Sequence, residues 1–353
     1  MSTIYLISTQ GKLTKKGETL VLTMDENTTK TIFPFKTEQL VLIGNIDLST
    51  PALKFLMHRQ IDTVFINKNG RYNGRLDFSA GKNIFLRIKQ YERLKEQSFR
   101  LKIARAIVSA KLKNQLHFIQ RLGRKNRTNI RQAKEQLYAL LNKSPNADNL
   151  DSLRGYEGAA ARAYFGVYAD AFLPEFARFN GRSMNPPQDN VNAVLSFLYT
   201  LILYRVDAAL ETVGLDPYAG YFHAIGYGKR SLSFDLMEEY RTPLADTLTA
   251  ALFNLGILQE NDFRQVDFSP ENDDFPLEPD EEHEAFNRKT GVLLNRDGLR
   301  KVISQFEKKL DTEIYFTPLQ KRITYKQLIM QQVKHFKRVL QGEEEQYRPL
   351  IQK

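Results

Sequence analysis

The hydrophobic pattern of the chain changes once, after Gly81, and this change restricts the fold more than any other feature. Before it, apolar residues form short, partly alternating runs: TIYLIS, TLVLT, LVLIG and DTVFI. Such runs, separated by turn residues such as Gly11 and Gly44, predict β-strands. After it, apolar residues recur every three or four positions, which predicts amphipathic helices. We therefore predict an α+β, multidomain protein with a small N-terminal β-strand domain over 1–82 and a larger all-α domain over 83–353.

Local signals refine both domains. One helix is expected to interrupt the strands, because Ser49 or Thr50 can cap it and Pro51 suits its first turn. NKNG followed by RYNGRLDF predicts a hairpin. The acidic, proline-containing segment 258–290 is typical of a long loop. Beyond the first long helical pattern, further helices are expected over six ranges: 127–143, 150–177, 188–213, 232–256, 295–310 and 322–341.

The sequence argues against cysteine-based sites, a signal peptide and a membrane-spanning helix. The 353 residues include no cysteine, so neither a disulfide nor a thiolate metal cage can form. The N-terminus has no basic stretch before an apolar core, so we expect no signal peptide. The longest apolar run, Ala193 to Tyr204, is too short for a membrane span of about 20 residues. We expect a cytoplasmic protein without a membrane partner.

Charge is unevenly distributed along the chain. The formal net charge is +10, and residues 99–134 hold eleven lysines or arginines and no acid. Residues 260–284 hold eleven acids and one base. This segregation favours a polyanionic partner on a basic surface. The alternative is an ordinary solvated helix face together with an acidic loop.

The stretch FHAIGYGKRSLSFDLMEEYR, residues 222–241, combines groups that can hold a metal ion. On a helix that begins near Ser233, Asp235 and Glu238 lie three positions apart and share a face. The turn GYGKR contains two glycines, so it can bring His223 back toward these acids. One imidazole with carboxylates suits Mg²⁺ or Mn²⁺ better than a structural zinc ion. The alternative is a serine-capped helix whose acids complement the helix dipole.

A second stretch, LRGYEGAAARAYF, lies in a helical pattern yet contains Gly155 and Gly158. Each glycine costs a helix interior about 1 kcal/mol relative to alanine, so the pair predicts close approach of another helix. Glu157 stands between them. A carboxylate in a tight junction should be paired, protonated or bound to a metal. The alternative is a simple ion pair with Arg154 or Arg162.

Together these motifs identify a family resemblance. RGYEGAAARAYF, NPPQDNVNAVLSFLYTLIL and LDPYAGYFHAIGYGKRSLSFDLMEEYR, with the N-terminal β layout, resemble the CRISPR-associated integrases of spacer acquisition over essentially the whole chain. The resemblance implies a metal-dependent DNA integrase and endonuclease. It makes the all-α domain the catalytic domain and the β domain the site of homodimerisation.

The resemblance also implies the site residues and the reaction. The metal ligands for Mg²⁺ or Mn²⁺ are Glu157, His223 and Glu238, and Asp235 is a further active-site position. Some members have aspartate where Glu238 stands, so this chain has one methylene more there. The free 3′-OH ends of short DNA fragments are joined to a CRISPR repeat by transesterification, which needs no covalent enzyme intermediate.

The remaining expectations concern partners. We expect Lys229 and Arg230 to position phosphate, and Asn192 to order the site from behind. Contacts to the backbone of double-stranded DNA are expected from the basic stretch: Arg100, Lys111, Arg121, Arg124 and Lys125. The other four histidines are not expected to take part in catalysis. The resemblance implies a small ferredoxin-like CRISPR adaptation protein as partner.

Two alternative functions stay open. One is a metal-dependent structure-selective DNA nuclease that acts by hydrolysis. The other is a non-catalytic DNA-binding scaffold.

Overall fold

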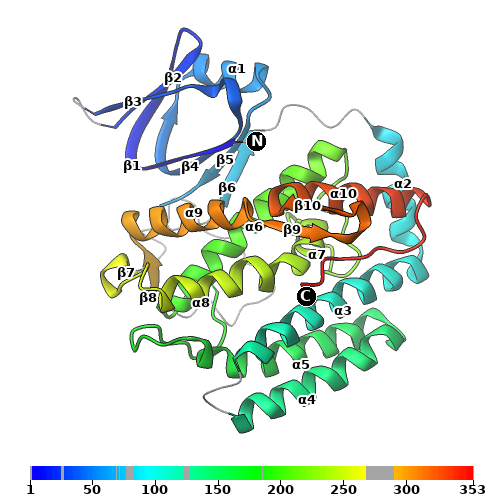
Figure 1. Cartoon of the computed structure of the whole chain (residues 1–353). Coiled ribbons are helices and arrows are strands. Elements are labelled where there is room, and N and C mark those ends of the chain that lie inside the picture. Colours follow the sequence, from blue (N-terminus) through cyan, green and yellow to red (C-terminus); the bar gives the residue numbers. More distant parts are fainter. Residues whose placement is uncertain are drawn as a thin grey trace. The chain divides into compact units, whose positions relative to one another are not determined.

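The chain forms two compact units, residues 1–80 and residues 81–353 (Figure 1). The computed structural model describes residues 2–24, 28–68, 70, 72–76, 83–122, 127–184, 186–267 and 290–352. A β region followed by a helical region is therefore confirmed. Each unit is built around its own apolar residues.

The first unit is a mixed six-stranded sheet in the order β3-β2-β1-β4-β5-β6. β1 runs parallel to β4 and β4 runs parallel to β5, whereas the other neighbouring pairs are antiparallel. The strands, with the short 3₁₀-helix η1 between two of them, are β1 (Ser2–Lys16), β2 (Thr19–Thr23), β3 (Thr29–Ile32), η1 (Pro34–Lys36), β4 (Thr37–Leu48), β5 (Asp62–Ile66) and β6 (Tyr72–Leu76).

The helix expected among the strands is α1 (Thr50–His58), which connects the parallel strands β4 and β5. The Ser49 side chain accepts a hydrogen bond from the Ala52 N–H and caps the helix. Phe55 and Leu56 join the apolar core of the sheet. Gly44 has a φ of 101°, and a Cβ there would lie 1.9 Å from the Ser8 carbonyl oxygen. Only glycine therefore fits at this point, where the paired strands β1 and β4 come very close.

The second unit is mainly helical. Its long helices are α2 (Ile84–Lys95), α3 (Gln97–Arg121), α4 (Arg127–Lys143), α5 (Leu150–Tyr168), α6 (Asn190–Val213), α7 (Ser231–Tyr240), α8 (Thr247–Asn254), α9 (Arg296–Leu310) and α10 (Tyr325–Gln341). A π-helical segment, η4 (Arg241–Asp246), joins α7 to α8. Short 3₁₀-helices occur at η2 (Ser144–Asn146), η3 (Ala169–Ala171), η5 (Glu260–Asp262) and η8 (Thr317–Leu319).

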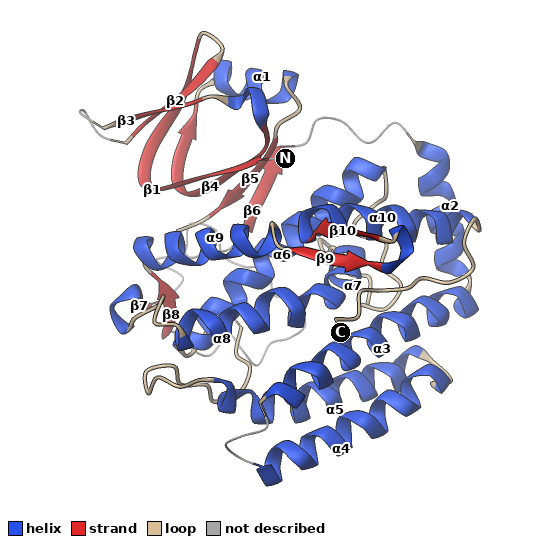
Figure 2. Cartoon of the chain, in the orientation of Figure 1, coloured by secondary structure: helices blue, strands red, loops and turns tan. Residues whose placement is uncertain are grey.

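The prediction that this unit is all-α is wrong in detail, because it contains two β-hairpins (Figure 2). One pairs β7 (Phe263–Asp267) with β8 (Thr290–Leu294), so both ends of the predicted loop 258–290 are structured. The other pairs β9 (Glu313–Phe316) with β10 (Lys321–Thr324) and delays the start of α10. The β9–β10 runs are rich in isoleucine, threonine and aromatic residues, which favour strands. Residues 268–289 lie outside the described part of the chain.

Two helices form the centre of this unit. α6 is long and apolar enough to cross a membrane, but 72% of its most apolar 18-residue stretch is buried against the rest of the protein. α3 lies beside α4 and α5 (Figure 1) and also contacts α7 and the π-helical segment. Because it has neighbours on several sides, the second half of α3 is buried almost all round. This burial decides which of its basic residues can reach solvent.

Candidate functional site

Within the segment between α6 and α7, residues 220–231 form a closed loop that contains His223. The loop closes where Gly220 meets Ser231: a Cβ on Gly220 would lie 2.5 Å from the Ser231 Cβ and 2.6 Å from the Ser231 carbonyl carbon. The Ser231 hydroxyl donates to the Ala224 carbonyl oxygen at 2.7 Å, and the Leu232 N–H donates to Pro217 at 2.9 Å. Gly220 is therefore required by close backbone approach rather than by an unusual φ.

Asp235, in the second turn of α7, holds this loop from inside. Its carboxylate accepts the backbone N–H groups of Tyr221, Phe222 and His223 at 2.5, 2.9 and 2.9 Å. It also lies 2.7 Å from Nδ1 of the His223 ring. Since a carboxylate oxygen accepts, the ring proton is assigned to Nδ1 and the lone pair of a neutral imidazole to Nε2.

Nε2 of His223 faces Glu238, which follows Asp235 by about one turn of α7. Their nearest atoms, Nε2 and Oε1, are 3.9 Å apart. Glu157 of α5 reaches the same place through Lys111 of α3, whose ammonium group bonds to Glu157 and lies 2.8 Å from Oε2 of Glu238. Three helices thus bring Glu157 and Glu238 to the Lys111 ammonium group, and the closed loop places His223 beside Glu238.

Two cations balance the carboxylates electrostatically. Burial alone raises the pKa of Glu238, but the positive charges of Arg241 and Lys111 outweigh it and lower the pKa to about 2. Burial alone lowers the pKa of Lys111, but Glu238 and Glu157 outweigh it and raise this pKa. The Arg241 guanidinium lies 3.2 Å from Oε1 of Glu238. At neutral pH, Glu238 is therefore a carboxylate and Lys111 an ammonium ion.

The donor set suits a hard divalent cation. Lys111 joins two carboxylates, and one imidazole nitrogen, Nε2 of His223, lies 3.9 Å from the second of them, Glu238. The side-chain exposures of 22% for Glu157 and 25% for His223, against 1% for Glu238, leave one side of the site open. Within the described ranges, no three histidine or acidic side chains already have metal-ligand spacing. The Lys111 ammonium group lies between the two glutamates.

A buried hydrogen-bond network holds the side chain on which the Arg241 guanidinium lies. Its guanidinium lies over the Tyr199 ring at 4.8 Å, and the Tyr199 hydroxyl donates to Asp246 at 2.6 Å. Tyr164 donates to the other Asp246 oxygen at 2.8 Å. Burial raises the pKa of Asp246. Arg241 and Asp246 bound the π-helical segment, a feature that often lies beside functional sites.

Two residues expected at the site have other partners. Arg230 forms an ion pair with Asp207 of α6 and lies over the Tyr218 ring, so its charge anchors the closed loop. The Asn192 side chain bonds to Arg182, Ser183, Gly181 and Asp189, all close to it in sequence. It orders the segment before α6, and its partner Arg182 lies over the Tyr199 ring, on which Arg241 also lies. An indirect role of Asn192 in ordering the site stays a prediction. Lys229 lies in the turn after Gly226, partly exposed.

The basic stretch does not form one exposed surface. Lys111 is only 8% exposed and belongs to the candidate site, because that face of α3 is turned inward. Arg100 is half-buried, whereas Arg121 is exposed. Arg124 and Lys125 lie outside the described residues. The expectation of five backbone-tracking side chains therefore needs correction at Lys111.

The two glycines of α5 do not mark a close helix contact. A Cβ at Gly155 would meet no atom within 4 Å, and one at Gly158 would meet only the Arg162 side chain at 3.8 Å. That prediction is wrong, and the structure gives the pair no packing role. Glu157 pairs with Lys111 instead of with Arg154, which bonds to Asp151 and to the Phe222 carbonyl oxygen.

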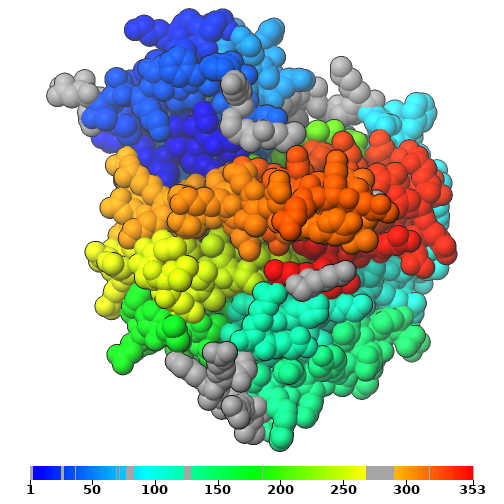
Figure 3. All heavy atoms as spheres, in the orientation of Figure 1, coloured from blue at the N-terminus to red at the C-terminus, as the bar shows by residue number. Residues whose placement is uncertain are grey.

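Glu239 has a role that sequence reasoning missed. Its buried carboxylate accepts hydrogen bonds from Gln332, from the Tyr347 hydroxyl and from the Leu350 N–H. Asn114 of α3 donates to the Leu350 carbonyl oxygen at 3.0 Å. The C-terminal segment is thus fixed to α3, α7 and α10, and it reaches the surface of the second unit (red in Figure 3). Burial raises the pKa of Glu239 to about 7.

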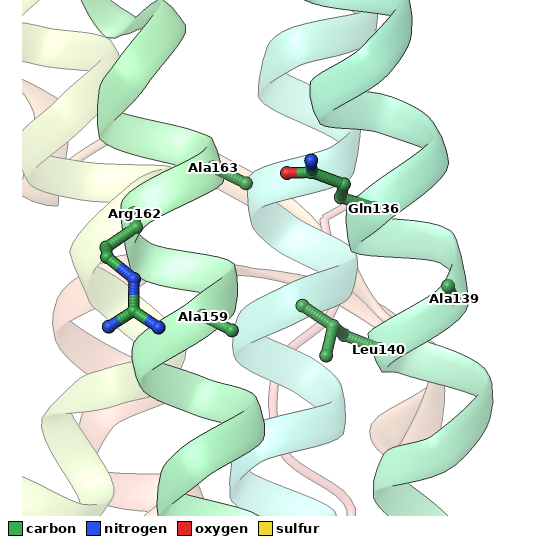
Figure 4. A pocket seen from close by; sticks show the side chains of 6 residues that line it. All are labelled: Gln136, Ala139, Leu140, Ala159, Arg162 and Ala163. Carbon is green, nitrogen blue, oxygen red and sulfur yellow. The ribbon is translucent and has the colours of Figure 1, made fainter.

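A separate hollow of about 530 Å³ lies between α4 and α5. Gln136 and Leu140 point across it toward Ala159 and Ala163 (Figure 4). Arg162 is the one charged residue of its lining, and Glu157 is not part of it. The hollow therefore lies apart from the candidate site.

Helical spacing contained some of the missed information. Arg241 follows Glu238 by three positions, so a shared face was predictable. Lys111 and Gln115 lie among Ile107, Leu112 and Ile119 on the apolar side of α3, and polar residues in an apolar stripe indicate a buried polar site. No local signal connects Tyr199 to Asp246.

Comparisons with known proteins agree with this architecture. The family model described as CRISPR associated protein Cas1 matches residues 4–269. The CRISPR-associated endonuclease Cas1 3 of Thermus thermophilus is 30% identical over 348 residues, 98% of this chain and 96% of that protein. The structure of a CAS1 protein from Thermotoga maritima superposes with a TM-score of 0.80 at 26% identity, covering 98% of this chain and 99% of that one.

A larger solved assembly is similar as well. A chain of the structure titled Cas6-RT-Cas1–Cas2 complex superposes with a TM-score of 0.81 at 25% identity. The match covers 99% of this chain but 36% of that chain. The similarity therefore concerns one part of a longer protein.

Proposed function

Because the chain belongs to the CRISPR associated protein Cas1 family, we propose that it is a metal-dependent DNA integrase and endonuclease of CRISPR adaptation. The observation that supports the proposal most is that Lys111 joins Glu157 to Glu238 while Nε2 of His223 lies 3.9 Å from Glu238, so the three proposed ligands are neighbours. Mg²⁺ or Mn²⁺ bound there would supply positive charge to the reacting phosphate and to the attacking and leaving oxygens.

The protein's own groups would hold and orient this site. The Asp235 carboxylate contacts Nδ1 of His223, which fixes the ring and leaves the lone pair on Nε2. Carboxylates commonly orient metal-binding histidines in this way. Glu157 and Glu238 supply oxygen ligands from two different helices. Arg241 adds a fixed positive charge beside Glu238, and the half-buried Lys229 is the remaining candidate for holding a phosphate.

The proposed reaction is an exchange of phosphodiester bonds. The 3′-oxygen of a short DNA fragment forms a bond to a backbone phosphorus at the edge of a CRISPR repeat. The bond from that phosphorus to the 3′-oxygen of the neighbouring nucleotide breaks, and the leaving oxygen takes up a proton in place of the one lost by the attacking hydroxyl. The number of phosphodiester bonds is unchanged, so no cofactor beyond the cation is needed.

We further propose two protein partners. One is a second copy of the chain, joined through the first unit. The other is a small ferredoxin-like CRISPR adaptation protein, supported by the similar solved assembly whose title pairs Cas1 with Cas2. Exposed basic residues such as Arg121 would contact the DNA backbone.

The test uses purified protein, Mn²⁺ and a branched DNA that mimics a half-joined fragment. Release of the flap together with resealing of the broken strand supports transesterification. Glu157→Ala and His223→Ala should abolish both events, whereas Asp148→Ala, at an exposed acid just before the same helix, should abolish neither.

Other results identify the alternatives. Cutting without resealing favours a hydrolytic nuclease. Salt-sensitive binding with no reaction, even when the partner protein is added, favours a non-catalytic scaffold.

A further inference from the structure

Lys111 is the most unusual charged residue of the second unit. Its side chain lies inside α3's contacts with α5 and α7, yet it is an ammonium ion between two carboxylates. An ammonium group has three donors and no lone pair, so it can bind acceptors but cannot be a metal ligand. The oxygens that it contacts are those that the proposed function assigns to a divalent cation.

Lys111 contacts both carboxylates. It donates a hydrogen bond to Glu157, and its ammonium nitrogen lies 2.8 Å from Oε2 of Glu238. Its partner Glu238 keeps Arg241 as a second cation when Lys111 moves. Lys111 also has a four-carbon flexible stem, which allows its charged end to move while the helix stays in place.

Hydrogen bonds hold α3 close to the site. Asn114, three residues after Lys111, donates to the carbonyl oxygens of Glu239 and Leu350 and accepts from the Gln352 N–H. These bonds fix the helix relative to α7 and the C-terminal segment. The Lys111 side chain can therefore move while α3 stays in place.

We propose that Lys111 is a resident cation that holds Glu157 and Glu238 together and competes with the divalent ion for them. This inference rests on the proposed function. With Lys111 in place, the carboxylates are kept close without metal, and their mutual repulsion is cancelled. Binding of a divalent ion displaces the ammonium group, because two like-charged ions held against the same pair of carboxylates repel each other. Lys111 is thus a positioning residue whose charge sets the affinity of the site for metal.

The experiment measures Mn²⁺ affinity without DNA, by electron paramagnetic resonance of the free ion or by calorimetry. Lys111→Met removes the competing charge and should raise the Mn²⁺ affinity by about tenfold or more, the usual scale of coupling between competing ligands. The metal-free variant should melt at a lower temperature than the original protein, and Mn²⁺ should raise its melting temperature by more. Lys113→Met, at an exposed position of the same helix, should leave the affinity unchanged.

Two further variants keep the test decisive. Lys111→Gln is neutral but can still hydrogen-bond to both carboxylates, and it replaces Lys111→Met if that variant does not fold. Lys111→Arg keeps the charge and should bind Mn²⁺ no more tightly than the original protein. An unchanged or lower Mn²⁺ affinity in a folded neutral variant overturns the inference while leaving the proposed function in place. Failure of the original protein to bind Mn²⁺ at all instead refutes the proposed metal dependence.

Discussion

Replacing Asp235 by asparagine tests how the site is built. The Asp235 carboxylate accepts three backbone N–H groups, from Tyr221, Phe222 and His223, and contacts the His223 ring. Asparagine has a single acceptor oxygen, so one pair of these contacts is lost whichever way its amide is turned. Hydrogen bonds to a charged group contribute roughly 1.5–3 kcal/mol each. We expect Asp235→Asn to lower the free energy of unfolding by about 3–6 kcal/mol, a large part of the roughly 5–15 kcal/mol of a typical protein.

The assay is equilibrium unfolding in urea, with Asp151→Asn as the control. Asp151 lies on the exposed surface of α5, so the same chemical change there should alter the free energy of unfolding by less than about 0.5 kcal/mol. A second readout is the ¹⁵N spectrum of the His223 ring, in which the share of rings with the proton on Nδ1 should fall. An Asp235→Asn variant within about 1 kcal/mol of the original protein, with the ring tautomer unchanged, would refute the reasoning.

Three further predictions follow from the same structure. Gly220→Ala places a Cβ against Ser231 and should cost about 1–3 kcal/mol, with a loss of flap resealing of at least about 100-fold if the loop shifts by about 1 Å; normal activity would contradict this. Gly155→Ala meets open space and should raise stability by up to about 1 kcal/mol in thermal unfolding, so destabilisation would be the contrary result. The pKa of Glu239 is raised by burial from 4.5 to about 7, so its contribution to stability is fully present below about pH 4.5 and is lost as pH rises through about 7. Between pH 4.5 and 8 the free energy of unfolding of the original protein should therefore fall by about 3 kcal/mol relative to that of Glu239→Gln. If urea unfolding shows the same pH dependence of stability for both proteins, the raised pKa of Glu239 is refuted.

Much of the architecture follows from local pattern. The alternating runs mark the strands of the first unit, and the helical periodicity places most helices within a few residues of their observed ends. The two hairpins of the second unit were missed because strands of four or five residues carry little periodic signal. β7 and β8 are also separated by the acidic segment, so their pairing is not evident from adjacent sequence.

The candidate site divides in the same way. The spacing of Asp235 and Glu238 on α7, with His223 before a glycine-containing turn, is a local property, so the sequence by itself determined that these groups could meet. The roles of the basic residues depended on contacts between distant segments. Lys111 and Glu157 are 46 positions apart, and Arg230 is 23 positions from Asp207. Periodicity shows that a residue lies on a helix face, but it does not show which neighbour covers that face. Only the tertiary structure therefore decided that Lys111 lies buried between two carboxylates and that Arg230 anchors a loop, because burial and ion pairing are set by non-local packing.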